Sequence, residues 1–227
     1  MKIFIDTEFT GLCKNTTLIS IGLVDELGNG LYCELLDYDK NQVNTWLQEN
    51  VIQNLWLEQG QPPIEENIEY YKGNKKYIRK VINNWLSKYE IVEWVSDVAH
   101  YDFILLIDLI YEEAINIPYM KHSASIHDIN QDIAKYYNIS ELEAFDKSRE
   151  DILNSKGIEI KGLKHNALYD AKVIKEIYKI VNRSYLTINV NLKDIDEFKT
   201  VFEILKDERI SEDIRNEYLK NLGFIKE

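Results

Sequence analysis

The sequence predicts an α/β domain in which a mixed sheet of five strands carries helices on its faces, followed by a helical C-terminal extension. Two observations point to this class. The chain opens with three short β-rich runs whose short connections favour an antiparallel meander. Amphipathic helical segments then alternate with two more apolar runs, the pattern of a sheet covered by helices. The predicted order is βββαβαβα.

The predicted strands are short apolar or β-branched runs bounded by turn signals. They are residues 2–6, 16–24, 31–38, 91–96 and 121–126. The first of them ends at Asp6, and a turn with two glycines at 26–30 joins the second strand to the third.

The predicted helices of the domain show apolar residues at helical spacing. They are residues 44–57, 75–89, 102–115, 130–137 and 165–181. The pattern is strongest in 75–89, where Ile78, Ile82 and Trp85 fall on one face. Residues 59–74 contain a Pro-Pro pair and are predicted to form a loop.

Composition and pattern divide the chain into a domain at 1–182 and an extension at 183–227 that packs on the same domain. Within the domain, the charged segment 140–156 is predicted to be a helical insertion. The extension carries two expected helices, at 194–206 and 211–221.

The bulk composition excludes several classes of protein. No apolar run approaches the ~20 residues needed to span a membrane, and the N-terminus lacks the apolar core of a secretory signal. Cys13 and Cys33 have no metal-site spacing. We therefore expect a cytoplasmic protein with reduced cysteines.

The formal net charge of −12 argues against a protein that coats long duplexes, because neutralisation of phosphates by basic residues supplies that affinity. It is compatible with an enzyme that grips only the end of a strand. Bound metal ions would offset the charge of an acidic cluster locally.

Two acids close the first strand. Asp6 and Glu8 are two residues apart, so in a strand they project from the same face. They follow an apolar run that should lie inside the sheet, where paired carboxylates are costly unless they are solvated or bound to metal. A surface pair of this kind is also common, so the pair alone indicates a site only weakly.

Asp102 opens the apolar helix after the fourth strand, where an aspartate is also favoured as a helix cap. Asp97, nearer the strand end, is its main rival, and Asp108 is a weaker one. The sequence alone leaves the choice among them open.

His165 and Asp170 begin the last helix of the domain. On a continuous helix they would be about 140° apart, so they converge only if His165 lies in the loop or first turn. Read alone, His165 is a surface histidine at a helix start. His100, His122 and His127 have no zinc-site spacing, and His127 is interpreted as structural.

Taken together, Asp6 and Glu8, then Asp102, then the His165–Asp170 pair resemble the DEDDh group of DnaQ-like 3′–5′ exonucleases. The resemblance implies their RNase H-like fold over residues 1–182. Local stretches are similar to the mycobacterial ribonuclease AS-type exoribonuclease branch: Asp6-Thr7-Glu8-Phe9, Leu18-Ile19-Ser20-Ile21-Gly22-Leu23-Val24, Thr45-Trp46-Leu47-Gln48-Glu49-Asn50-Val51 and His165-Asn166-Ala167-Leu168-Tyr169-Asp170-Ala171.

The resemblance implies a site for two Mg²⁺ ions, which Mn²⁺ can replace. Asp6 would bridge both ions, Glu8 and Asp170 would complete one position, and Asp102 would support the other, partly through water. Two such ions stabilise both the attacking and the leaving oxygen of a phosphodiester.

In the same scheme His165 is the general base, and Thr7, Phe9 and Leu12 contact the terminal sugar and base. The implied substrate is the 3′ end of a single strand, with RNA favoured, and the product is a nucleoside 5′-monophosphate. A DNA exonuclease of the same fold and a non-catalytic nucleic-acid or protein adaptor stay open as alternatives, and a homodimer is possible.

Overall fold

The protein is described here from a computed structural model, which places residues 1–60, 62, 65–110, 122–182, 215–216 and 219–220. By its internal contacts the chain divides into two units, Met1–Arg183 and Ser184–Glu227. Within the described residues, none of the helices has the length and apolar character needed to cross a bilayer.

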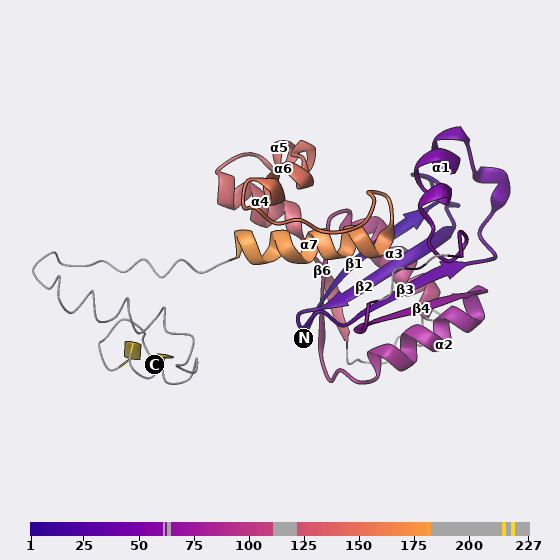
Figure 1. Cartoon of the computed structure of the whole chain (residues 1–227), viewed down its shortest axis with the longest axis horizontal. Coiled ribbons are helices and arrows are strands. Elements are labelled where there is room, and N and C mark those ends of the chain that lie inside the picture. The colour runs from indigo at the N-terminus through magenta and orange to yellow at the C-terminus, as the bar shows by residue number, and fades with distance from the viewer. Residues whose placement is uncertain (61, 63–64, 111–121, 183–214, 217–218, 221–227) are drawn as a thin grey trace, which may run out of the picture. The chain divides into compact units, whose positions relative to one another are not determined.

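The described part of the first unit contains one mixed sheet (Figure 1). Its strands are β1 (Lys2–Phe9), β2 (Leu18–Asp25), β3 (Gly30–Leu35), β4 (Ile68–Gly73), β5 (Val92–Ser96) and β6 (His122–Asp128). They lie in the order β4-β3-β2-β1-β5-β6. The first three strands form the predicted antiparallel meander, and the remaining pairings are parallel.

The sheet has six strands where the sequence predicted five. The additional strand, β4, lies in the segment 59–74 that was predicted to be a loop, and it pairs in parallel with β3 from Gly30↔Ile68 to Leu35↔Gly73. Its middle residues are exposed or half-buried because it forms an edge of the sheet. A half-buried edge strand shows little apolar pattern, which is why the sequence did not reveal it.

The helices are α1 (Thr45–Asn50), α2 (Lys75–Leu86), α3 (Ala99–Ile110), α4 (Ile129–Tyr137), α5 (Glu141–Asp146), α6 (Arg149–Asn154) and α7 (Ala167–Val181), with 3₁₀ turns at Lys40–Gln42 and Ile52–Asn54. The predicted helix 44–57 is shorter and ends in the second 3₁₀ turn. The end of the predicted helix 102–115, and the predicted helix 194–206, lie outside the described residues. Of 211–221 only 215–216 and 219–220 are described, and these are helical.

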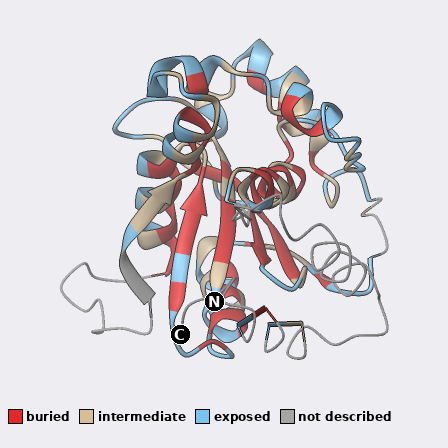
Figure 2. Ribbon diagram, turned by 90° about the vertical axis from the view of Figure 1, so that its left-hand side faces the viewer, coloured by how far each residue is buried: buried red, intermediate tan, exposed pale blue. Residues whose placement is uncertain are grey.

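The two faces of the sheet are covered by different helices, and Figure 2 shows the central strands as buried. Ile3 and Ile5 of β1 pack in one core with residues of α2 and α3. Phe4, which points the opposite way, packs in a second core with residues of α4, α6 and α7. Because side chains alternate along a strand, Asp6 and Glu8 project on the same face as Phe4, toward α7.

Gly22 of β2 lets the start of α7 lie directly on the sheet. A β-carbon at Gly22 would stand 2.2 Å from the carbonyl oxygen of Ala167 and 2.4 Å from the amide nitrogen of Leu168. Both are backbone atoms at the first turn of the helix that carries Asp170. The position of α7, and with it that of Asp170, therefore depends on the missing side chain.

We expect Gly22→Ala to be severely destabilising, because backbone rather than a flexible side chain must move. A loss above about 3 kcal/mol would lower the Tm by roughly 6–12 °C in a domain of this size. Thermal melting followed by circular dichroism measures the change. An unchanged Tm would show that α7 does not pack this closely on β2.

Candidate active site

The acid pair of β1 faces a cavity of about 520 Å³ at the end of the strand. Asp6 and Glu8 are half-buried, and both line this cavity. Lys164, His165 and Asp170 line it from the other side. Residues more than 150 positions apart in the sequence therefore meet at one site.

Asn166 fixes the start of α7. It is fully buried, and its side-chain oxygen accepts hydrogen bonds from the backbone N–H groups of Leu168 and Tyr169. Its amide group donates to the carbonyl oxygen of Asn54 at 2.8 Å. The helix therefore begins at Ala167, and Asp170 falls in its first turn.

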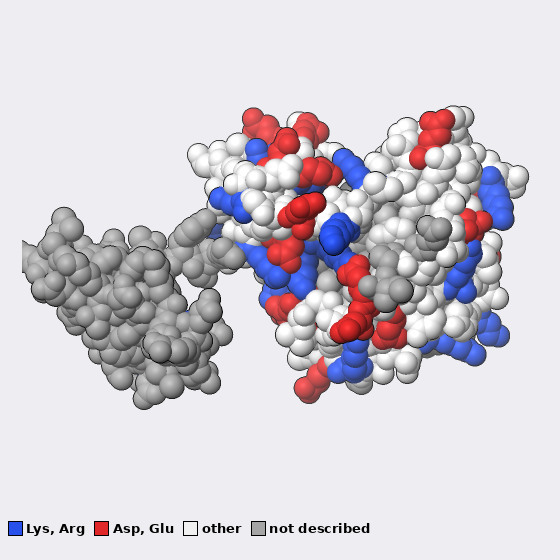
Figure 3. Space-filling view, viewed as in Figure 1, with Lys and Arg blue, Asp and Glu red and all other residues white. Residues whose placement is uncertain are grey.

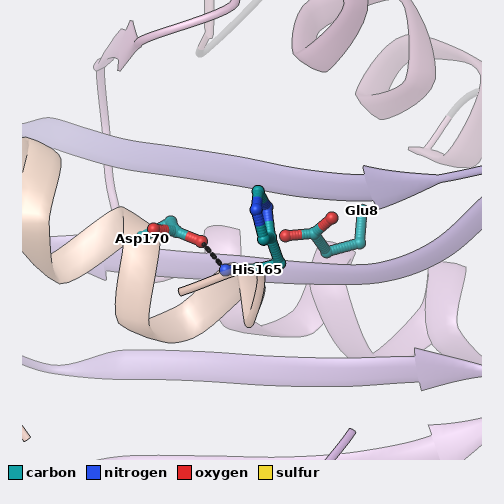
Figure 4. A group of neighbouring side chains, drawn as sticks. All are labelled: Glu8, His165 and Asp170. Atoms are coloured by element: carbon teal, nitrogen blue, oxygen red, sulfur yellow. Dashed lines mark hydrogen bonds between the residues drawn. The ribbon is translucent and has the colours of Figure 1, made fainter. Parts of the chain in front are cut away.

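His165 lies in the loop before α7, as convergence with Asp170 required. Its φ of 62° is left-handed, and its backbone N–H donates to Oδ2 of Asp170 at 2.8 Å. Its ring meets Trp46 edge-on, with 5.1 Å between centroids. Single ligand atoms of Glu8, His165 and Asp170 all lie within 4.8 Å of one another. Figure 4 shows the three side chains gathered at the start of α7.

Asp102 is buried in the first turn of α3, and it does not line the cavity. Its carboxylate accepts hydrogen bonds from Oγ1 of Thr7, at 2.5 Å, and from Oγ of Ser96. Among the neighbouring acids, Asp102 raises the pKa of Asp6 the most. It therefore acts beside Asp6, held in place by two hydroxyl groups.

The rival Asp97 also lines the cavity, but its carboxylate is engaged by Arg149. Nε of Arg149 lies 2.8 Å from one oxygen and Nη2 lies 2.7 Å from the other. The amide of Asn130 donates to the same carboxylate at 3.0 Å. Asp108, the weaker rival, pairs with Lys75 and is 68% exposed. Asp102 remains the best candidate for the third acid.

We expect Arg149→Ala to destabilise the protein, because it leaves the Asp97 carboxylate without its bidentate partner. Both side chains are mostly buried, with exposures of 12% and 22%. A loss of about 1–3 kcal/mol should lower the Tm by roughly 2–12 °C.

A double-mutant cycle checks the Arg149–Asp97 interaction. Asp97→Asn in the Arg149→Ala background should recover part of the lost stability, since it removes the unpaired charge. Additive losses in thermal melts would show that the pair contributes no coupling energy.

The electrostatics of the cluster favour a bound cation. Burial, followed by the charges of neighbouring acids, raises the pKa values of Asp6 and Glu8 well above their usual range. Burial also raises the pKa values of Asp102 and Asp170 to about 7. A divalent cation would relieve this repulsion, and carboxylate oxygens are the ligands that Mg²⁺ takes. The donor set thus fits the implied metals.

The predicted substrate-contacting residues have different surroundings. Thr7 and Phe9 line the cavity, and Phe9 stacks on Tyr101 with 5.1 Å between centroids. Leu12 is 75% exposed and does not line it. Lining residues that sequence reasoning missed include Phe145 and Arg149 from segment 140–156, which the resemblance did not cover.

Comparison with known proteins places this chain in a family. The model of the Rv2179c-like family, a 3′-5′ exoribonuclease domain, matches residues 1–182. The chain belongs to this family. Membership in the Rv2179c-like family confirms the predicted resemblance and makes the protein a 3′–5′ exonuclease. Among curated proteins, none matches the sequence.

Solved structures share the fold of this Rv2179c-like chain. Pop2p of S. pombe, in its Mg²⁺- and Mn²⁺-bound form, has a TM-score of 0.51 and 18% identity over 81% of this chain and 83% of its own. A full-length 3′-exonuclease has a TM-score of 0.50 and 13% identity, covering 78% of each chain. A 3′-exonuclease that recognises the histone mRNA stem-loop has a TM-score of 0.54 and 13% identity, over 79% of this chain and 63% of its own. These likenesses confirm the predicted RNase H-like fold.

Proposed function

We propose that this exonuclease removes nucleoside 5′-monophosphates from the 3′ end of single-stranded RNA, using two Mg²⁺ ions or, in their place, Mn²⁺. The observation that carries the proposal is the convergence of Glu8, His165 and Asp170 within 4.8 Å, in the cavity that Asp6 also lines. The exoribonuclease family supports the choice of RNA.

The four acids have distinct roles in this proposal. Asp6, Glu8 and Asp170 would hold the ions directly, because they line the cavity. Asp102 would act through water, because Thr7 and Ser96 already bind its carboxylate. The ions, when bound, supply positive charge to the attacking and leaving oxygens of the phosphodiester.

His165 is the proposed general base. Burial and the charge of Lys164 lower the pKa of its ring, so the ring is neutral near pH 7 and can accept a proton from the attacking water. Its backbone bond to Asp170 and the edge contact with Trp46 restrict where it points. The protein therefore orients the His165 ring before the substrate binds.

The rim of the cavity suits a single strand. Trp46 beside His165 is 52% exposed and Phe145 is 55% exposed, so both can stack on unpaired bases. Lys164 offers positive charge for phosphate at the same cavity. A cytoplasmic location, a homodimer and the packing of the extension on the domain stay predictions.

One assay tests this function against the alternatives. A 5′-labelled single-stranded RNA should shorten stepwise from its 3′ end when Mg²⁺ or Mn²⁺ is added, and more slowly as a blunt duplex. The matched DNA should be degraded more slowly, because its sugars lack the 2′-OH. Equal rates on both would favour a general exonuclease, and no shortening at all would favour the adaptor.

A further inference from the structure

A second cavity, of about 930 Å³, lies along α7. Val24 and Gly28 line it from β2 and the following turn, Trp56 lines it from the segment after α1, and Lys172 and Lys175 line it from α7. None of the proposed catalytic residues lines it. Its volume is in the range of small-molecule sites.

Lys175 is a buried lysine that lines this cavity and has no hydrogen-bond or ion-pair partner within the described part of the chain. Its side chain is only 7% exposed, and among the described residues it forms no hydrogen bond or ion pair. Its Nζ lies at the β2–β3 turn, 3.4 Å from where a β-carbon of Gly28 would stand. Burying an ammonium group without a partner is costly, so an anion beside Lys175 would be stabilising.

The other lysines of the cavity differ from Lys175. Lys172 is held by Glu65, with 2.7 Å from Nζ to each carboxylate oxygen. Lys161 is exposed at the rim. Two acidic residues, Glu159 and Glu176, also line the cavity, but within the described residues neither forms an ion pair with Lys175, and Glu176 is paired with Lys179. Glu176, Asp25 and Glu26 offset part of the Lys175 charge through space, but none of them forms an ion pair with it, so an anion in the cavity can still pair with its ammonium group.

An aromatic side chain also lines the cavity that Lys175 lines. Trp56 is half-buried and packs against Tyr32, with 5.2 Å between ring centroids, and Tyr70, with 6.2 Å. These contacts hold the indole in place, and its remaining surface lines the cavity. A planar base can stack on such a ring.

We propose that this cavity binds a nucleotide, with Lys175 pairing with the phosphate and Trp56 contacting the base. The phosphate can come from a free nucleoside 5′-monophosphate or from a nucleotide within an RNA strand. Viewed as in Figure 1, the face that α7 crosses carries basic and acidic side chains side by side (Figure 3). The site is separate from catalysis, although Lys175 and Asp170 share one helix.

The test uses calorimetric titration in EDTA, so that the acidic cluster, without metal, repels phosphate. The probes are adenosine 5′-monophosphate, inorganic phosphate and a short RNA. The wild-type protein should bind the monophosphate, and more tightly than inorganic phosphate. Lys175→Met should weaken this binding about 10- to 100-fold, the usual effect of losing a charged hydrogen bond. Lys135→Met, which removes an exposed charge on α4, should leave it unchanged.

Folding is checked in the same variants. Lys175→Met should keep or raise the Tm, because it removes a buried charge without a partner. Lys161→Met changes only an exposed rim residue and should weaken binding a few-fold even if Lys175→Met fails to fold. If RNA displaces the monophosphate, the site binds a nucleotide within a strand. If RNA does not displace it, the site binds the free nucleotide. No binding of any probe, or equal losses in the Lys135 and Lys175 variants, would overturn the proposal.

Discussion

Asp6→Asn is expected to abolish RNA hydrolysis, together with the thermal stabilisation that Mg²⁺ or Mn²⁺ gives the wild-type protein. A cation that binds only the folded state at 100 times its Kd adds about 2.7 kcal/mol, or roughly 5–10 °C in Tm. Asp6 lines the cavity beside the charges of Asp102, Asp170 and Glu8, so replacing it should remove this gain. Thermal melts with and without millimolar metal measure it.

Without metal, the ranking of the two melting temperatures should reverse. The neutral amide that Asp6→Asn introduces relieves repulsion in the cluster, so the metal-free variant should melt above the metal-free wild-type protein. Asp108→Asn is the matched control, since it removes an exposed acid of α3, and it should keep both activity and the metal shift. A wild-type Tm that does not change on adding metal would contradict the proposed metal site.

His165→Ala is expected to lower turnover by about 10²- to 10⁴-fold, the usual cost of losing a general base. Metal affinity should change little, because the carboxylates remain. Asp170→Asn should lower both, since Asp170 lines the cavity as a candidate ligand. Single-turnover rates at saturating Mn²⁺, beside metal titrations of each variant, separate the two roles.

The proximity of His165 to Glu8 and Asp170 gives this experiment a definite alternative. A ring nitrogen within 4.8 Å of both carboxylates is also placed to be a ligand. His165 would be a ligand if the metal concentration at half-saturation rose as much in His165→Ala as in Asp170→Asn. An unchanged rate would exclude it as the base.

Most of the fold was predictable because its strands and helices carry strong local patterns. The meander of β1 to β3 and the amphipathic α2 follow from residue type and spacing alone. The edge strand β4 was missed because its pairing with β3, not its own sequence, makes it a strand. Edge strands are defined by a neighbour, and local patterns do not contain that information.

The candidate site residues could be proposed together from the sequence, but their contacts and distances could not. Spacing indicated that Asp6 and Glu8 share a face, and that His165 meets Asp170 only from the loop or the first turn of the last helix. The partners that decide which acid is available were not visible, because Arg149 reaches Asp97 across 52 positions and Thr7 reaches Asp102 across 95. The buried cap Asn166 likewise depends on the distant Asn54.

The left-handed backbone of His165 means that folding and chemistry make opposite demands on one position. A non-glycine residue held at a φ of 62° costs about 1–2 kcal/mol, which a glycine there would avoid. A screen that selects only for thermostability would therefore tend to enrich glycine at this position and discard the proposed base. Selection for turnover must preserve the strained histidine, so this position is a trade-off between stability and activity.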